Sequence, residues 1–327
     1  MGGLDSRVVV ITGGSLGIGR EVARKCVSEG ATVVIGARGE EALAKTLKEL
    51  YAIKEKPHRS YTIDVGKTEE VKGFARFCAE RFPEIHGLVN CAGVYGPIGK
   101  TTEVDMEEFA AAIRINFLGT VLMCHAFAPL LKGSTDYADY AEKKCLTQRR
   151  KGAKNLRESA DYADYAEEKA REPGGRKKIV NYSGGGAAGP FPRFSAYATS
   201  KTAIVRFTEN LALELADESF DVNCIAPGFV ITRLHQDTLK AGPQLATESF
   251  YENTKKQMES GGVPPEKAAD LTAFLLSDAS DGITGKFLSA PWDPWQEKAF
   301  QERLRKDKDF ATLRRIDDKT FFKNREA

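Results

Sequence analysis

Cysteine and histidine are scarce in this sequence, with six and four residues respectively among 327. The cysteines show no Cys-x-x-Cys spacing and the histidines are dispersed, so we expect reduced thiols and no metal site. No apolar stretch reaches the length of a membrane span, and the N-terminus has no basic leader followed by an apolar segment. These absences predict a protein without a membrane partner, and the cytoplasm is the default compartment.

An excess of charge of one sign is also missing. The formal net charge is +2, and basic residues are interleaved with acidic ones, so no field suited to nucleic acid is expected. Apolar residues make up 42% of the chain and charged residues 29%, which is typical of ordinary globular proteins. We therefore predict a soluble, globular protein with no nucleic-acid partner.

β-branched runs alternate with segments of helical period through most of the chain. Helices are expected at 17–29, 40–51, 105–131 and 196–216. The predicted strands lie at 7–12, 32–36, 59–63, 86–90, 178–183, 221–225 and 286–289. This alternation, with right-handed crossovers, predicts the α/β class: a single Rossmann-type, doubly wound parallel sheet within residues 1–291.

Two segments fall outside this alternation. Residues 132–177 form a polar insertion with a near-repeat at 136–144 and 161–169, which indicates either a surface helical hairpin or a role in assembly or substrate gating. Residues 292–327 form a charge-rich C-terminal extension with a helix expected at 297–308. The extension either attaches to the surface or packs over a cleft or a neighbouring subunit. Trp292 and Trp295 at its start either line a pocket or anchor it by packing.

A glycine-rich turn, Thr12-Gly-Gly-Ser-Leu-Gly-Ile-Gly19, follows the first strand and opens the first helix. Glycines at 13, 17 and 19 permit a tight turn and a close approach of the backbone to a pyrophosphate, while the amides at the helix N-terminus face its charge. The second strand ends at Ala37-Arg38, without the acidic residue that would bind a ribose 2′-hydroxyl. Arg38 offers a charged fork to a 2′-phosphate, so NADP(H) is favoured over NAD(H).

Tyr197 and Lys201 stand four residues apart in a predicted helix, so both project from one face toward a common site. A nearby ammonium favours the phenolate of a tyrosine whose ordinary pKa is about 10. The pair therefore predicts that Tyr197 is a general acid/base, giving a proton to a carbonyl oxygen in reduction and taking it back in oxidation.

The order and context of these motifs, over about residues 5–290 apart from the insertion, resemble the short-chain dehydrogenase/reductase family. The resemblance implies that Asp64-Val65 contacts adenine, that Asn90-Cys-Ala-Gly93 turns against the cofactor, and that Asn116 kinks its helix and positions a relay water. It also implies a loop at 227–232 that holds the nicotinamide carboxamide, and a homodimer or homotetramer built through helices 105–131 and 196–216. The residues expected at the cofactor are Gly13, Ser15, Leu16, Gly17, Ile18, Gly19, Arg38, Asp64, Val65, Asn90, Ala92, Gly93, Tyr197, Lys201, Pro227, Gly228, Val230 and Thr232.

The sequence departs from the family pattern at the substrate oxygen. Gly184 stands where the family has a serine, and Ser183 lies one residue early on a strand whose side chains alternate between faces. Either Ser183 turns inward and joins Tyr197, Lys201 and Asn116 as a catalytic residue, or the amides of Gly184–Gly186 donate in its place. The loss of one such donor typically costs about 3 kcal/mol of transition-state stabilisation. The glycines also enlarge the pocket, which suggests a bulky polar substrate such as a sugar or sugar nucleotide.

The remaining pocket residues are expected from the loop at 190–195 and the variable stretch 233–262. Arg193 and Arg233 either bind an anionic group or stay solvated, and His235 is interpreted as a surface histidine. We expect an NADP(H)-dependent oxidoreductase acting on a small-molecule carbonyl or secondary alcohol. The alternatives are a nucleotide-binding regulatory or scaffold protein on the same fold, and an epimerase or dehydratase that uses transient hydride transfer.

Overall fold

The computed structural model describes residues 3–133 and 175–316. A sheet of seven strands, parallel throughout, has the order β3-β2-β1-β4-β5-β6-β7. Its strands are β1 (Val8–Thr12), β2 (Thr32–Ala37), β3 (Arg59–Thr62), β4 (Gly87–Asn90), β5 (Lys177–Tyr182), β6 (Phe220–Ala226) and β7 (Phe287–Ser289). The predicted strands and the Rossmann-type sheet are confirmed, with every strand end within one residue of its expected place.

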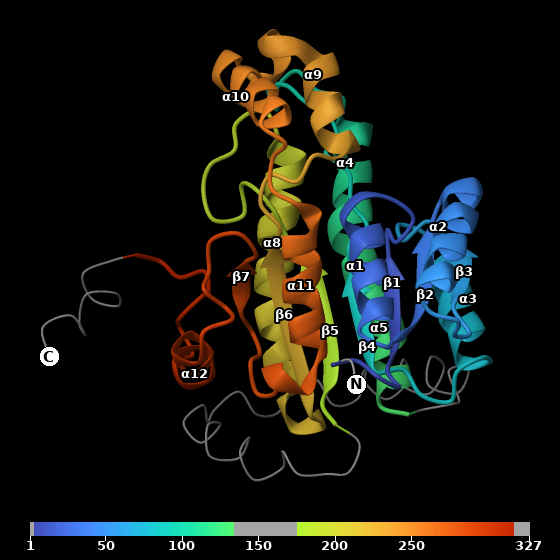
Figure 1. Cartoon of the computed structure of the whole chain (residues 1–327). Coiled ribbons are helices and arrows are strands. Elements are labelled where there is room, and N and C mark those ends of the chain that lie inside the picture. The colour runs from blue at the N-terminus through green and yellow to red at the C-terminus, as the bar shows by residue number, and fades with distance from the viewer. Residues whose placement is uncertain (1–2, 134–174, 317–327) are drawn as a thin grey trace, which may run out of the picture.

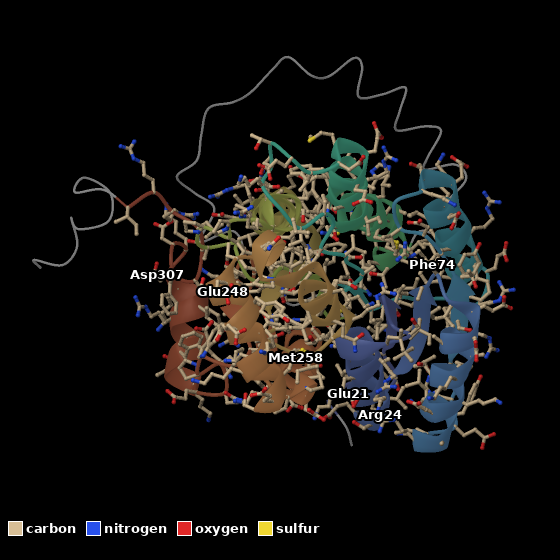
Figure 2. The ribbon with its side chains drawn as sticks, turned by 90° about the horizontal axis from the view of Figure 1, so that it is seen from above. Glu21, Arg24, Phe74, Glu248, Met258 and Asp307 are labelled. Carbon is tan, nitrogen blue, oxygen red and sulfur yellow. The ribbon has the colours of Figure 1, made fainter. Side chains whose placement is uncertain are left out.

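Helices cover both faces of the sheet, as a parallel sheet of buried apolar strands requires. One face carries α1 (Gly17–Ser28), α2 (Glu40–Ile53) and α11 (Pro265–Leu276), which share a core with β1 and β2. The other carries α3 (Thr68–Ala79), α5 (Gly119–Leu131) and α8 (Ser195–Glu214) (Figure 1). Figure 2 labels Glu21 on α1 and Phe74 on α3, which belong to these two different layers.

The chain reverses its direction across the sheet between β1 and β4. It leaves β1 through β2 to the edge strand β3 and then returns to pair β4 with β1, in a register that sets Thr12 beside Asn90. Loops that diverge from such a switch point leave a crevice beyond the carboxyl ends of the strands. The glycine-rich turn after β1 and the loop after β4 therefore lie on opposite sides of one crevice.

The helix predicted over 105–131 contains a defect at its centre. It comprises α4 (Met106–Ile113), a π-helical turn η1 (Arg114–Leu118) and α5, with the Asp105 carboxylate capping α4 by accepting from the Glu108 amide at 2.8 Å. A π-turn inserts one extra residue per turn and is frequent at functional sites. The expected kink at Asn116 coincides with this turn.

Residues Met106–Leu131 form a run that is long and apolar enough to cross a membrane, with a mean hydropathy of 1.4 in its most apolar window. The prediction that no segment reaches this length is therefore wrong. In this fold the C-terminal part of the run packs inside the protein, because Met123, Phe127 and Leu131 are buried in the core beneath β4 and β5, and 39% of the most apolar window is buried.

The variable stretch after β6 forms two helices, α9 (Arg233–Ala246) and α10 (Glu248–Glu259). Gly242 interrupts α9 with a φ of 77°, and Thr247 begins α10 with its hydroxyl accepting from the Phe250 amide. The pair lies beyond the carboxyl ends of the strands (Figure 1), and thus beside the crevice.

The described part of the C-terminal extension packs on the β7 edge of the sheet. Its helix α12 (Lys298–Lys306) falls within the predicted range. Two short 3-10 turns, η2 (Ala216–Glu218) and η3 (Asp278–Ser280), precede the extension in the chain. The buried ammonium of Lys286 donates to the carbonyls of Asp307 (2.6 Å) and Phe310 (3.1 Å), and Arg206 of α8 donates to Leu313. Up to residue 316 the extension is therefore attached to the side of the molecule.

The two tryptophans of the extension have different environments. Trp295 is buried against Phe274 with ring centroids 5.4 Å apart, whereas Trp292 is 76% exposed and lines the crevice. Both predicted roles are therefore realised, one by each residue. The near-repeat and nearly all of the insertion at 132–177 lie outside the described residues.

Candidate active site

A cavity of about 750 Å³ occupies the crevice at the carboxyl ends of the strands. Residues from the loops that follow β1 to β6 line it, together with Ser289 of β7, so most loops on this side of the sheet contribute. The lining includes the glycine-rich turn, Tyr197 and residues of α9 and α10.

The glycine-rich turn packs closely against neighbouring backbone and borders the cavity. Gly13 has a φ of +68°, and a Cβ on it would lie 2.9 Å from the Ala92 amide nitrogen. A Cβ on Gly19 would lie 2.3 Å from the Gly13 carbonyl oxygen. Helix α1 begins after Leu16 without a capping side chain, so its first amides remain available to an anion. Ser15, Leu16, Gly17 and Ile18 also line the cavity, so these residues fit the pyrophosphate of a dinucleotide.

The adenosine end of the cavity lies beyond β2 and β3. Arg38, Asp64 and Val65 line it, and Asp64 is held in place because its Oδ1 accepts from the Gly66 amide at 2.9 Å. Arg38 is exposed and has no carboxylate partner within residues 3–133 and 175–316. Its guanidinium is therefore available to a phosphate at this end of the cavity.

The loop after β4 is fixed by polar side chains beneath it. The Thr12 hydroxyl accepts from the amides of Cys91 (3.2 Å) and Ala92 (3.3 Å). Asn90 is buried, donates to Asn181 Oδ1 at 2.9 Å and does not line the cavity, unlike Ala92 and Gly93. The side chain of Asn90 is thus placed to support the loop. Thr12 is a supporting residue that the sequence motifs do not single out, and the strand register places it opposite Asn90.

Asn116 joins the π-turn to this loop and to α8. Its side chain accepts from the Val94 amide and donates to the Val94 carbonyl, both at 2.8 Å, and it donates to the Ser200 hydroxyl at 3.0 Å. Asn116 is fully buried and lies outside the cavity lining. Asn116 thus connects the π-helical turn, the loop after β4 and α8 by hydrogen bonds.

Tyr197 and Lys201 lie on the same side of α8, as their spacing predicts. Tyr197 lines the cavity and packs edge-on against Tyr95, with ring centroids 4.8 Å apart. The Lys201 ammonium lies 5.6 Å from the centre of the Tyr197 ring and donates to the Tyr182 carbonyl at 2.9 Å. A Cβ on Gly93 would lie 3.3 Å from this ammonium. Because Gly93 has no side chain, the Lys201 ammonium can lie close to the loop after β4.

Burial dominates the protonation of both groups. It lowers the pKa of Lys201 to about 8 and raises the pKa of Tyr197 above its ordinary value. The sequence predicts that the neighbouring lysine lowers the pKa of Tyr197, whereas burial raises it. The loss of hydration outweighs the effect of the Lys201 ammonium, which is not hydrogen-bonded to the phenol. Tyr197 therefore holds its proton at neutral pH in this structure.

Position 184 has no space for the serine that the family carries there. A Cβ on Gly184 would lie 2.3 Å from the Tyr197 hydroxyl oxygen. Ser183 is directed elsewhere: it is buried, its hydroxyl donates to the Lys201 carbonyl at 3.0 Å, and it does not line the cavity. Ser183 is therefore not turned into the cavity, because the extended backbone points its side chain toward α8, and a catalytic role for Ser183 stays a prediction.

The amides of Gly184–Gly186 remain as the other donor candidates. All three glycines line the cavity, and none of their amides has an acceptor in the described parts of the chain. The Ala187 amide donates to the Gly184 carbonyl, and Gly186 has a φ of +83°. These features define a tight turn of the kind that needs glycine at its third residue.

The loop after β6 closes the far side of the cavity. Pro227, Gly228, Val230 and Thr232 all line it. His235 also lines it and is only 8% exposed, so the interpretation of His235 as a surface histidine is wrong. Arg233 lies at its exposed rim, whereas Arg193 and Ser183 do not contribute to the lining.

Five of the six cysteines are free thiols, and Cys145 lies outside the described residues. In residues 3–133 and 175–316, no three His, Cys, Asp or Glu side chains are grouped closely enough to hold a metal ion.

Comparison with protein families agrees with this geometry. Residues 7–137 match a family model described as short chain dehydrogenase, and residues 150–290 match one described as Enoyl-(Acyl carrier protein) reductase. The chain belongs to the short-chain dehydrogenase/reductase family. Enzymes of this family use a nicotinamide cofactor, and this member is an oxidoreductase acting on CH–OH or C=O groups.

Known proteins cover nearly the whole chain at low identity. A diacetyl reductase [(S)-acetoin forming] of Staphylococcus epidermidis is 26% identical, over 86% of this chain and 95% of its own length. A short chain dehydrogenase of Salmonella enterica has a TM-score of 0.67 at 25% identity, covering 88% of this chain and 97% of its own. A Shigella flexneri protein solved in complex with NADP has a TM-score of 0.65 at 23% identity, covering 88% and 98%. These similarities leave the substrate open.

Proposed function

We propose that this short-chain dehydrogenase/reductase interconverts a carbonyl compound and its secondary alcohol with NADP(H), and that Tyr197 is the general acid/base. The observation that carries the proposal is the position of Tyr197, which lines the same cavity as the glycine-rich turn and has Lys201 beside it. A bound nicotinamide would supply or accept the hydride at the carbon atom.

In the direction of reduction, the Tyr197 hydroxyl donates its proton to the carbonyl oxygen as that oxygen becomes an alcohol. Burial favours the protonated phenol that this step needs. Lys201 lies close enough to stabilise the resulting phenolate by its charge, and its own lowered pKa allows it to exchange a proton near neutral pH. Asn116 orients the loop at Val94 and anchors Ser200 of α8.

The amides of Gly184–Gly186 replace the serine hydroxyl that other members use. The three amides have no acceptor among the described residues, and Gly184 lies beside the Tyr197 hydroxyl, so an amide of this turn can donate to an oxygen on which negative charge develops. This proposal accounts for a glycine at 184, since the tyrosine hydroxyl itself occupies the space that a side chain would need.

The preference for NADP(H) is supported by Arg38 at the adenosine end of the cavity and by the lack of an acidic residue at position 37. We further propose a soluble, cytoplasmic homodimer or homotetramer whose partner is a small molecule and whose catalytic unit is contained in residues 1–291. Burial of Met123, Phe127 and Leu131 of the apolar run Met106–Leu131 in the core supports solubility.

The test is a fluorescence titration of the purified chain with NADPH and with NADH, followed by a spectrophotometric assay of NADPH oxidation with diacetyl and a panel of larger ketones. We expect NADPH to bind at least tenfold more tightly than NADH and to be oxidised by at least one ketone. Binding without turnover across the panel would favour a regulatory nucleotide-binding protein. Isomerised or dehydrated product without net NADPH consumption would indicate an epimerase or dehydratase.

A further inference from the structure

The substrate end of the cavity is built from aromatic rings. Tyr95 contacts Tyr197 at 4.8 Å between centroids, and Phe191 contacts Phe250 at 4.9 Å. The fully buried Phe194 packs behind them, stacked on Phe191 at 4.5 Å and edge-on to Tyr95 at 5.2 Å. Four of these rings, Tyr95, Phe191, Tyr197 and Phe250, line the cavity, and we call them the aromatic wall.

Polar side chains are sparse around this wall. Within the described residues, the cavity lining contains no Asn, Gln, Glu or Lys, and its one carboxylate is Asp64 at the adenosine end. Each sugar hydroxyl that is buried without a hydrogen-bond partner loses its bonds to water at a cost of about 1–3 kcal/mol. The lining therefore fits a molecule with few hydroxyl groups better than the sugar or sugar nucleotide suggested by the sequence.

The remaining surface near Tyr197 is small or open. Gly185 and Gly189 line the cavity, and a Cβ on either would meet no atom within 4 Å. Ala188 lies between them along the same loop. A rigid, planar molecule can thus reach the Tyr197 hydroxyl while its faces contact aromatic rings.

His235 supplies one polar group beside the aromatic wall. Its ring lies 3.9 Å from the centre of Phe229 and 6.1 Å from that of Tyr95. Its Nδ1 accepts from the Thr232 amide at 3.4 Å, which assigns the proton of the neutral ring to Nε2. No acceptor for this Nε2–H occurs in the described part of the chain, although the residue is 92% buried. The imidazole thus has a donor left for a ligand.

We propose that the substrate is a planar aromatic ketone or the corresponding alcohol, held by the aromatic wall, with an oxygen substituent remote from the reacting carbon that accepts a hydrogen bond from His235 Nε2. The reaction assumed here is that of the proposed function. The substrate class is inferred from the residues that line the cavity. His235 is a specificity-determining residue in this scheme and takes no part in proton transfer.

Binding tests the proposal without turnover. Isothermal titration of the full chain compares 2-naphthol with decahydro-2-naphthol, which has the same carbon skeleton without aromatic rings. We expect 2-naphthol to bind at least fivefold more tightly, since each ring contact contributes roughly 2- to 12-fold. Phe250→Leu, which keeps an apolar side chain, should lower this ratio by about threefold or more. Phe300→Leu, far from the cavity in α12, should leave it unchanged.

The His235 contact is tested with 6-methoxy-2-naphthol. We expect the methoxy group to improve binding about fivefold in the native chain and to give no improvement in His235→Phe, which retains a ring against Phe229. His235→Gln should restore part of the gain, because it restores a donor. Equal effects of the methoxy group in the native chain and in His235→Phe would overturn the assignment of His235.

Turnover separates this inference from the proposed function. NADPH oxidation is measured with 6-methoxy-1-tetralone, its saturated counterpart 6-methoxy-1-decalone, and diacetyl. A preference for the tetralone of at least tenfold in kcat/KM supports the aromatic substrate class. Reduction of diacetyl with no preference for the tetralone would overturn that class while the reductase function stands. Tight naphthol binding without any NADPH oxidation would support the aromatic site and contradict the proposed reaction.

Discussion

A side chain at position 184 is expected to impair the enzyme, although a serine at this position is what the family pattern would supply. In Gly184→Ala the new Cβ would lie 2.3 Å from the Tyr197 hydroxyl oxygen. Ordinary contact begins about 1 Å further out, so the phenol has to move by about that distance. Tyr95 packs edge-on against the Tyr197 ring, which limits where it can go.

The size of the effect follows from the geometry of proton transfer. A displacement of about 1 Å at a reacting group can reduce the rate about 100-fold, equivalent to about 2.7 kcal/mol of transition-state stabilisation. We expect kcat/KM for NADPH-dependent ketone reduction to fall by about this factor in Gly184→Ala. Gly184→Ser should fall similarly, because its Cβ meets the same obstacle.

Gly185→Ala is the matched control, since its Cβ meets no atom within 4 Å and its amide is retained. Its kcat/KM should stay within about threefold of the native value, while Gly185→Pro, which removes one candidate amide donor, should lose about tenfold or more. Circular dichroism and thermal melting establish that each variant is folded. Undiminished or increased activity in folded Gly184→Ser would refute the reasoning about this position.

Three further predictions concern the cofactor, the lysine and the core. Arg38→Ala should raise the Kd for NADPH about tenfold or more and leave the Kd for NADH within twofold, measured by nicotinamide fluorescence, whereas Arg24→Ala on the outer face of α1 (Figure 2) should change neither. Because burial lowers the pKa of Lys201 to about 8, this side chain binds more protons in the unfolded chain than in the folded chain between pH 8 and 10.5, so Lys201 adds a positive term to the slope of unfolding free energy against pH. Urea titrations at several pH values should give a less positive slope for Lys201→Met than for the native chain, and an unchanged slope would contradict the pKa assignment. Lys178 and Asp221 form an ion pair at 2.7 Å with both side chains fully buried, and Arg176 also donates to Asp221 at 2.8 Å. Because Asp221 keeps this second partner, Lys178→Met should lower the unfolding free energy by about 1–3 kcal/mol without changing the Kd for NADPH.

The fold was accessible from the sequence because its signals are local and redundant. Strands β1 and β2, at Val8–Thr12 and Thr32–Ala37, are rich in β-branched residues, and Gly13 and Gly19 of the turn after β1 lie too close to neighbouring backbone for a side chain. The spacing of Tyr197 and Lys201 likewise places both side chains on one helix face. Such patterns depend on backbone periodicity alone.

The features that escaped sequence reasoning depend on tertiary contacts. His235 resembles a surface residue in the sequence, and becomes buried only because α9 folds over the carboxyl ends of the strands. The direction of Ser183 and the collision at Gly184 depend on how closely α8 approaches β5. The aromatic wall joins residues from three separate loops or helices, at 95, 191–197 and 250, and no single stretch of sequence reveals it.

The central claim is that the Tyr197 hydroxyl transfers the proton that accompanies hydride transfer. The most direct measurement compares Tyr197→Phe with Tyr95→Phe, its neighbour at 4.8 Å, in single-turnover NADPH oxidation with a reducible ketone and in NADPH titration. We predict that Tyr197→Phe slows turnover at least 100-fold while the Kd for NADPH stays within about twofold, and that Tyr95→Phe retains turnover within about tenfold. Turnover above one tenth of the native rate in folded, NADPH-binding Tyr197→Phe would contradict the account.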